Sequence, residues 1–149
     1  MNILIIENEI YLAQKVVSRL LDDWHSCDYI ESPNIDNLTK DYDTILLSTS
    51  LPSALCKNII KKYSENSIIL LLVSYISDET VTNPIKDGAK DYIMKPFIMD
   101  ELIRKIYHYK DCRSLKRELQ TLREYFEFTM TDIDTTDVLL PPSFPTLIE

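Results

Sequence analysis

The chain has 149 residues, enough for one domain with an appendage, and its 24 acidic against 16 basic side chains give a net charge of −8. That charge argues against this chain gripping a nucleic-acid backbone by itself, because such binding depends on lysine and arginine neutralising phosphates. DNA binding by a segment outside the chain stays open. A single glycine in the whole sequence excludes glycine-rich phosphate or dinucleotide loops.

The cysteines and the apolar runs indicate the cellular compartment of the protein and argue against disulfides, metal sites and membrane spans. Cys27, Cys56 and Cys112 form no C-x-x-C pair or Cys/His cluster, so they predict free thiols and neither a disulfide framework nor a metal site. The N-terminus does not resemble a signal peptide, and the longest apolar run, 68–73, is too short to span a membrane. We therefore expect a cytoplasmic protein with no cofactor, no metal and no membrane partner.

Strands and amphipathic helices alternate along the first ~110 residues. In chain order the sequence predicts a buried strand at 3–6, a helix at 9–24, a weak strand at 27–30, a short helix at 35–38, a buried strand at 44–47, a helix capped by Ser53, and buried strands at 68–73 and 91–94. This alternation is typical of an α/β protein with a parallel sheet covered by helices on both faces. Its functional crevice is expected at the carboxyl ends of the strands.

Three sequence motifs follow one another at characteristic distances along the chain. Residues 88–97 read G-A-K-D-Y-I-M-K-P-F, residues 43–52 read D-T-I-L-L-S-T-S-L-P, and residues 3–9 form an apolar strand that ends in an acidic turn. Together they resemble the receiver domain of bacterial response regulators, over residues 1–112. The resemblance implies a five-stranded, doubly wound, flavodoxin-like (CheY-like) fold.

In that family, two carboxylates after the first strand and one after the third hold magnesium, and the third is phosphorylated. At the matching positions this chain has Glu7, Asn8 and Ser48, so one acidic position is kept and the phosphoacceptor is replaced. The family's lysine is retained as Lys95, which is expected either to shape the adjoining loop or to pair with Glu7. One carboxylate beside a lysine gives Mg²⁺ little reason to bind.

The other family positions are also altered. The switch hydroxyl falls at Val73 or Ser74, and Tyr92 occupies the rotating-aromatic position, where simple surface packing is the alternative explanation. Asp43 cannot replace Ser48 as acceptor, because five strand residues place it roughly 16 Å away. Where the family has its fourth helix, Pro84 predicts a short, displaced or partly disordered helix that begins near it.

The last helix is predicted to continue past the receiver, over residues 98–131. Its apolar positions suggest a coiled-coil seam for a homodimer, with an irregularity near Cys112; the alternative is a helix that folds back on its own domain. The basic residues in the middle of this helix are expected to be a solvated face. The proposed seam residues are Leu102, Ile106, Tyr109, Leu115, Leu119, Leu122 and Phe126.

Residues 132–149 have the acidic, then proline-rich, composition of a flexible linker. The sequence as a whole therefore predicts a non-enzymatic receiver of an atypical, orphan response regulator that works without phosphorylation. It would control transcription through a DNA-binding output domain absent from this chain. The alternative is a stand-alone pseudo-receiver that acts as an adaptor for a protein partner.

Overall fold

The computed structural model describes residues 1–23, 25–31, 38 and 40–132, without the side chains of 129–132. The chain divides into two compact units, Met1–Lys110 and Asp111–Glu149. The elements in chain order are β1 Asn2–Ile6, α1 Ile10–Asp22, β2 Ser26–Ile30, β3 Thr44–Ser48, α2 Ser53–Tyr63, β4 Ile68–Val73, the π-helical turn η2 Asp78–Thr82, α3 Asn83–Asp87, β5 Asp91–Met94 and α4 Met99–Asp132.

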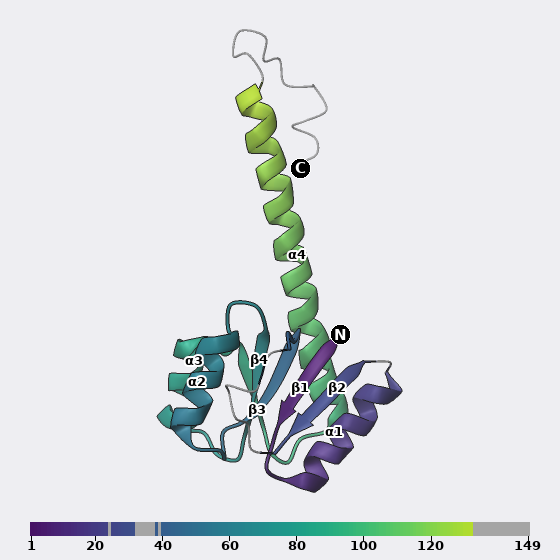
Figure 1. The fold of residues 1–149 in the computed structure, drawn as a ribbon, viewed down its shortest axis with the longest axis vertical. Helices are drawn as coiled ribbons and strands as arrows, with labels where there is room; N and C mark the ends of the chain where they lie inside the picture. Colours follow the sequence, from purple (N-terminus) through teal and green to yellow (C-terminus); the bar gives the residue numbers. More distant parts are fainter. Residues whose placement is uncertain (24, 32–37, 39, 133–149) are drawn as a thin grey trace. The chain divides into compact units, whose positions relative to one another are not determined.

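The strands form one parallel sheet in the order β2-β1-β3-β4-β5 (Figure 1). Strands β1, β3 and β4 are almost wholly buried, as their unbroken apolar runs predict, whereas the edge strand β2 is half-buried. Because β1 pairs with both β2 and β3, the strand order reverses there. This is the topological switch point at which α/β sheets form their crevice. The predicted fold class is confirmed.

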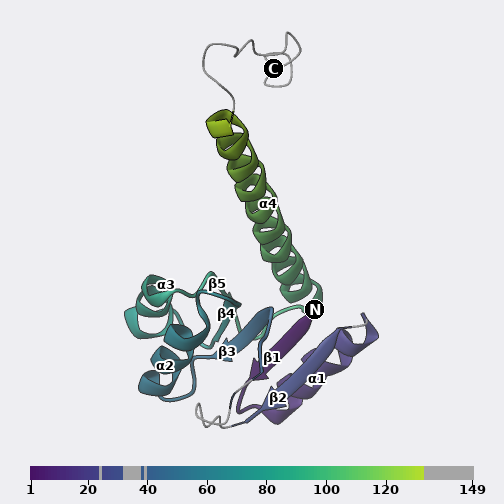
Figure 2. The ribbon, with the colours of Figure 1, turned by 45° about the horizontal axis from the view of Figure 1, so that its top comes forward.

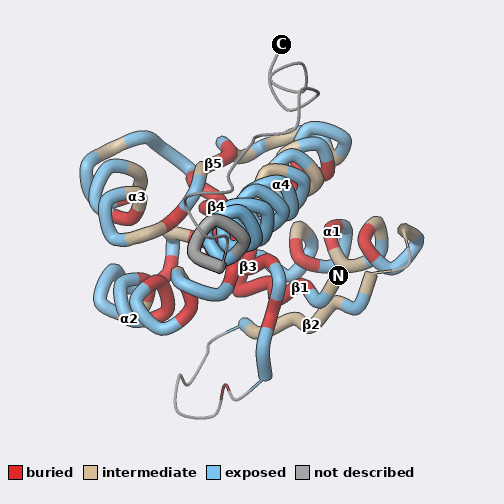
Figure 3. Tube along the Cα trace, turned by 90° about the horizontal axis from the view of Figure 1, so that it is seen from above, coloured by how far each residue is buried: buried red, intermediate tan, exposed pale blue. Residues whose placement is uncertain are grey.

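Helices cover both faces of the sheet. In Figures 2 and 3, α2 and α3 lie on one side and α1 lies on the other. Alternate strand residues supply the two cores. One core joins Leu4 and Ile6 to α2; the other joins Ile3 and Ile5 to α1 and to the first turns of α4.

The segment before Pro84 differs from the prediction. Pro84 does lie in the first turn of α3, but helical structure already begins at Asp78, in η2. The cause is a reciprocal cap: the Thr80 N–H donates to Ser77 Oγ at 3.2 Å, and the Ser77 N–H donates to Thr80 Oγ1 at 2.9 Å. This pair supports a turn that the β-branched sequence alone disfavours.

Two smaller predictions also change. Helix α2 has Pro52 at its cap and Ser53 as its first residue, so Ser53 is not the cap. The short helix expected at 35–38 lies outside the described residues except for Leu38, which is buried and not helical.

The predicted dimer seam is wrong in its first part. Leu102 and Ile106 are 0% and 1% exposed because they pack into the core of their own domain, and Tyr109 packs against that core. These residues are therefore unavailable to a second chain. Leu115, Leu119 and Leu122 are 58%, 59% and 54% exposed.

In the described part of the chain, no helix has the length and apolarity needed to cross a membrane.

Gly88, the residue that ends α3, is required by both backbone and space. Its φ is +134°, and an added Cβ would lie 2.6 Å from Ser64 Cβ.

We expect Gly88→Ala to lower the free energy of unfolding by about 2 kcal/mol or more in urea titrations. The double variant Gly88→Ala/Ser64→Gly should recover part of the lost stability. Removing the Ser64 side chain relieves the steric conflict, whereas the backbone strain at position 88 remains. The exposed control Lys86→Ala should change stability by less than about 0.5 kcal/mol. An unchanged midpoint for Gly88→Ala would contradict the assignment.

Candidate functional site

Four of the predicted site residues meet at the carboxyl edge of the sheet. Glu7 and Asn8 follow β1, Ser48 is the last residue of β3, and Lys95 follows β5. Parallel strands bring these positions together because all carboxyl ends lie at one edge. Glu7 and Ser48 are fully buried, the Lys95 side chain is 8% exposed, and Asn8 is exposed.

A buried ion pair forms the centre of the site. Lys95 Nζ lies 2.8 Å from Glu7 Oε2, in contact but poorly aligned for a hydrogen bond. The other carboxylate oxygen, Oε1, accepts the backbone N–H of Glu9 at 3.1 Å. The exposed Glu9 side chain also approaches the pair, with its Oε1 3.6 Å from the same ammonium group. Lys95 thus compensates the buried carboxylate of Glu7, as the sequence suggested.

A directional chain of hydrogen bonds leads away from Lys95. Its ammonium donates to Ser48 Oγ at 3.1 Å, and Ser48 Oγ lies 2.6 Å from Ser50 Oγ. The Ser50 hydroxyl donates its single proton to Asn8 Oδ1 at 2.7 Å, so Ser48 must be the donor in its bond with Ser50. The Asn8 amide oxygen and the Ser48 hydroxyl are therefore both engaged.

This arrangement does not fit magnesium. Mg²⁺ prefers several hard, anionic oxygens in octahedral geometry. Here Glu7 is compensated by Lys95, Asn8 and Ser48 are neutral, and their oxygens accept hydrogen bonds from within the protein. Among the described residues, no group of three or more His, Cys, Asp or Glu side chains is arranged to hold a metal. Ser48, which the sequence motif matches to the family's phosphorylated aspartate, offers a hydroxyl and no carboxylate.

The remaining predicted positions take no part in the hydrogen bonds and the ion pair that join Glu7, Asn8, Ser48 and Lys95. Val73 ends β4 with its side chain fully buried, and Ser74, the next residue, is exposed. Tyr92 is half-buried against the core on the α2 side, with the Lys105 ammonium 5.8 Å from its ring centre. Asp43 lies at the opposite edge of the sheet, where its carboxylate accepts the Asn2 N–H. Asp43 thus precedes β3, whereas Ser48 is its last residue.

Two residues of the site were missed at the level of sequence. Ser50 links Ser48 to Asn8, and Glu9 extends the acidic side of the ion pair. The only available signal was their position, since each lies two residues beyond a predicted site residue. Periodicity gives no information on loop side-chain directions, so neither role could be derived.

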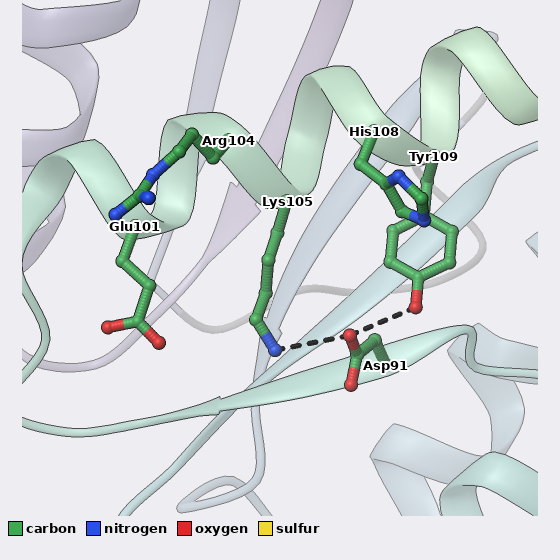
Figure 4. Close-up of a pocket in the computed structure, with 6 residues that line it drawn as sticks. All are labelled: Asp91, Glu101, Arg104, Lys105, His108 and Tyr109. Carbon is green, nitrogen blue, oxygen red and sulfur yellow. Dashed lines mark hydrogen bonds and ion pairs between the residues drawn. The ribbon is translucent and has the colours of Figure 1, made fainter.

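A second polar cluster lies on β5 and the start of α4 (Figure 4). Asp91 accepts the Tyr92 N–H at 2.7 Å, the Lys105 ammonium at 3.1 Å and the Tyr109 hydroxyl at 2.9 Å. Burial raises the pKa of Asp91, but these donors together lower that pKa below its ordinary value. The cavity beside Asp91 is also lined by Glu101, Arg104 and His108. The cluster connects α4 to β5 and shares no residue with the site around Ser48.

Comparisons with known proteins give the class. The response regulator ArlR of Staphylococcus haemolyticus is 36% identical over 112 residues, which cover 70% of this chain and 50% of ArlR. The transcriptional regulatory protein DltR of Streptococcus agalactiae is 31% identical over 113 residues, which cover 71% and 50%. The chain thus spans about half the length of these curated relatives. No family model matches.

Solved structures agree with this. A CheY-like receiver domain protein from Methanospirillum hungatei superposes with a TM-score of 0.70 at 19% identity, covering 77% of this chain and 97% of that protein. A two-component response regulator from Clostridium difficile gives 0.61 at 25% identity, covering 71% and 92%. The chain belongs to the response-regulator family through its receiver domain.

The buried ion pair makes a prediction about stability. Lys95→Met would leave the Glu7 carboxylate buried without a countercharge, which typically costs about 3–5 kcal/mol. We expect a loss of that size in urea titrations, and a substantial recovery in Glu7→Gln/Lys95→Met, where no charge is buried.

Lys40→Met is the matched control, because Lys40 pairs with Asp28 at the surface, at 50% and 42% exposure. It should cost less than about 1 kcal/mol. Equal losses for Lys95→Met and Lys40→Met would contradict the central role of the buried pair.

Proposed function

We propose that this receiver domain regulates transcription without aspartyl phosphorylation, within a response regulator whose DNA-binding segment lies outside this chain. The control of transcription is supported by the relatives, one of which is named as a transcriptional regulatory protein. The acidic charge of the chain is consistent with DNA being contacted elsewhere. We place this regulator in the cytoplasm, as its cysteine usage predicts.

Independence from phosphorylation is supported by one observation above all: Ser48 stands at the acceptor position and is held by Lys95 at 3.1 Å. In an active receiver a lysine at this place would be available to a phosphoryl group. Here its charge is already compensated by Glu7, and its hydrogen bond goes to the side chain that replaces the acceptor. The buried charges are paired, and the side-chain oxygens of Asn8, Ser48 and Ser50 accept hydrogen bonds from within the protein, so we expect little affinity for either a metal ion or a phosphate donor.

A receiver without a phosphorylation trigger needs another way to reach its active assembly. We propose that self-association is constitutive and involves α4, which carries the exposed leucines Leu115, Leu119 and Leu122. A row of exposed leucines on one helix is disfavoured in a monomer.

The chemical test uses the intact chain. Incubation with acetyl phosphate and Mg²⁺ should leave the intact mass unchanged, and beryllofluoride should leave the amide NMR spectrum unchanged. The reason is that both reagents act on a metal-bound carboxylate, which Ser48 does not provide. A stable fraction heavier by one phosphate would overturn the proposal.

Restoring the carboxylates supplies the positive control. Asp at position 48 would compete with Glu7 for Lys95, and Ser48→Asp with Asn8→Asp would provide three carboxylates at one edge. We expect this double variant to bind Mg²⁺ more tightly than either single variant in calorimetric titration. Equally negligible binding in all variants would mean that the surrounding loops, and not only these two positions, exclude the metal.

A further inference from the structure

The apolar positions of α4 fall on two different faces of the helix. Each residue advances about 100° around an α-helix, so the core residues Leu102, Ile103 and Ile106 centre on one direction. By the same count, Leu115, Leu119 and Leu122 centre roughly 180° away. The first group is buried in the Met1–Lys110 unit, and the second is exposed. The irregularity at Cys112 is therefore a change of face, and a new heptad pattern starts there.

In that pattern the apolar residues occupy the a and d positions of a coiled coil. Leu115 and Leu122 are at d and Leu119 is at a, with Cys112 and Phe126 at the flanking a positions. The same register assigns the residues beside the seam, which in coiled coils form ion pairs between chains. Asp111 and Glu118 fall at g, and Lys116 and Arg123 fall at e.

We infer that this segment is the interface for a second copy of the chain, in a parallel, in-register, two-stranded coiled coil. In a parallel pair, each g side chain faces the e side chain five residues later on the other helix. Asp111 then faces Lys116 of the second copy, and Glu118 faces Arg123 of the second copy. Both contacts join opposite charges, and twofold symmetry repeats each of them.

An antiparallel pair would have the opposite electrostatics. There g faces g and e faces e, which places acidic beside acidic and basic beside basic residues. The four charged side chains are all exposed, and none forms an ion pair with another described residue of its own chain. Charge complementarity thus selects both the partner and its direction. Any segment that follows Asp132 would begin at the same end of the coil in both copies.

Charge reversal tests the partner. Sedimentation equilibrium of the 149-residue chain should show a dimer in the micromolar range. Lys116→Glu with Arg123→Glu, and separately Asp111→Lys with Glu118→Lys, should each raise the dissociation constant about tenfold or more. Mixing the two double variants should restore association as a heterodimer. The matched control Arg113→Glu with Arg117→Glu makes the same change in net charge at the outward b and f positions and should leave the dimer intact.

Oxidative cross-linking tests the direction. A parallel coil sets Cys112 beside Cys112 of the second copy, whereas an antiparallel coil separates them by several turns. Diamide should therefore give a disulfide-linked dimer whose Cys112–Cys112 peptide is found by mass spectrometry and is lost in Cys112→Ser. A dimer that persists without this cross-link would overturn the parallel register, and a monomer throughout the micromolar range would overturn the interface.

The inference extends the self-association within the proposed function, but neither measurement involves phosphorylation. Phosphorylation of the wild-type chain would refute the proposed function but would not contradict the coiled-coil interface. Failure of the coil would leave the chemistry of Ser48 unaffected.

Discussion

The ion pair between Glu7 and Lys95 is the constraint on which the rest of the site depends. It joins the ends of β1 and β5 across the carboxyl edge of the sheet, with Glu7 fully buried and the Lys95 side chain 8% exposed. A charge buried to this degree must be paired, or its desolvation costs several kcal/mol. The loops around it are arranged accordingly: the Glu9 N–H donates a hydrogen bond to the other oxygen of Glu7, and Ser48 Oγ accepts a hydrogen bond from the ammonium group.

The substitutions at the carboxyl edge become consistent once this pair is in place. In the buried part of the site one carboxylate, Glu7, faces one lysine, whereas Glu9 lies 3.6 Å from the ammonium group and is exposed. The buried charges are therefore balanced, and no divalent ion is needed to hold like charges together. Ser48 and Asn8 are polar without being charged, so they can complete the hydrogen-bond chain through Ser50 without disturbing that balance. Under the proposed function, the replacement of the acceptor and the replacement of a metal ligand would have one physical basis, since both leave the buried Glu7–Lys95 pair balanced.

Much of this could be predicted from the sequence, and the limits have physical causes. Continuous apolar runs fixed the central strands, and parallel topology then placed Glu7, Ser48 and Lys95 at one edge, because strand direction decides where such residues meet. The role of Ser50 could not be predicted, since it depends on a loop side chain turning towards Asn8. The turn at Asp78 was missed because a cap between Ser77 and Thr80 outweighs the low helix propensity of the residues it encloses.

The apolar residues of α4 show a different limit of prediction from sequence, which concerns what periodicity can reveal. A heptad-like spacing reports that apolar residues recur along a helix, but not which surface covers them. From Leu102 to Ile106 the cover is the helix's own domain, and beyond Cys112 the described chain offers Leu115, Leu119 and Leu122 no such cover. A long helix without tertiary support is only marginally stable in water, so its apolar face and its flanking charges are the features that specify a partner. The two successive three-residue steps around Cys112 separate these two roles, because they break the heptad spacing close to the point where the second unit begins.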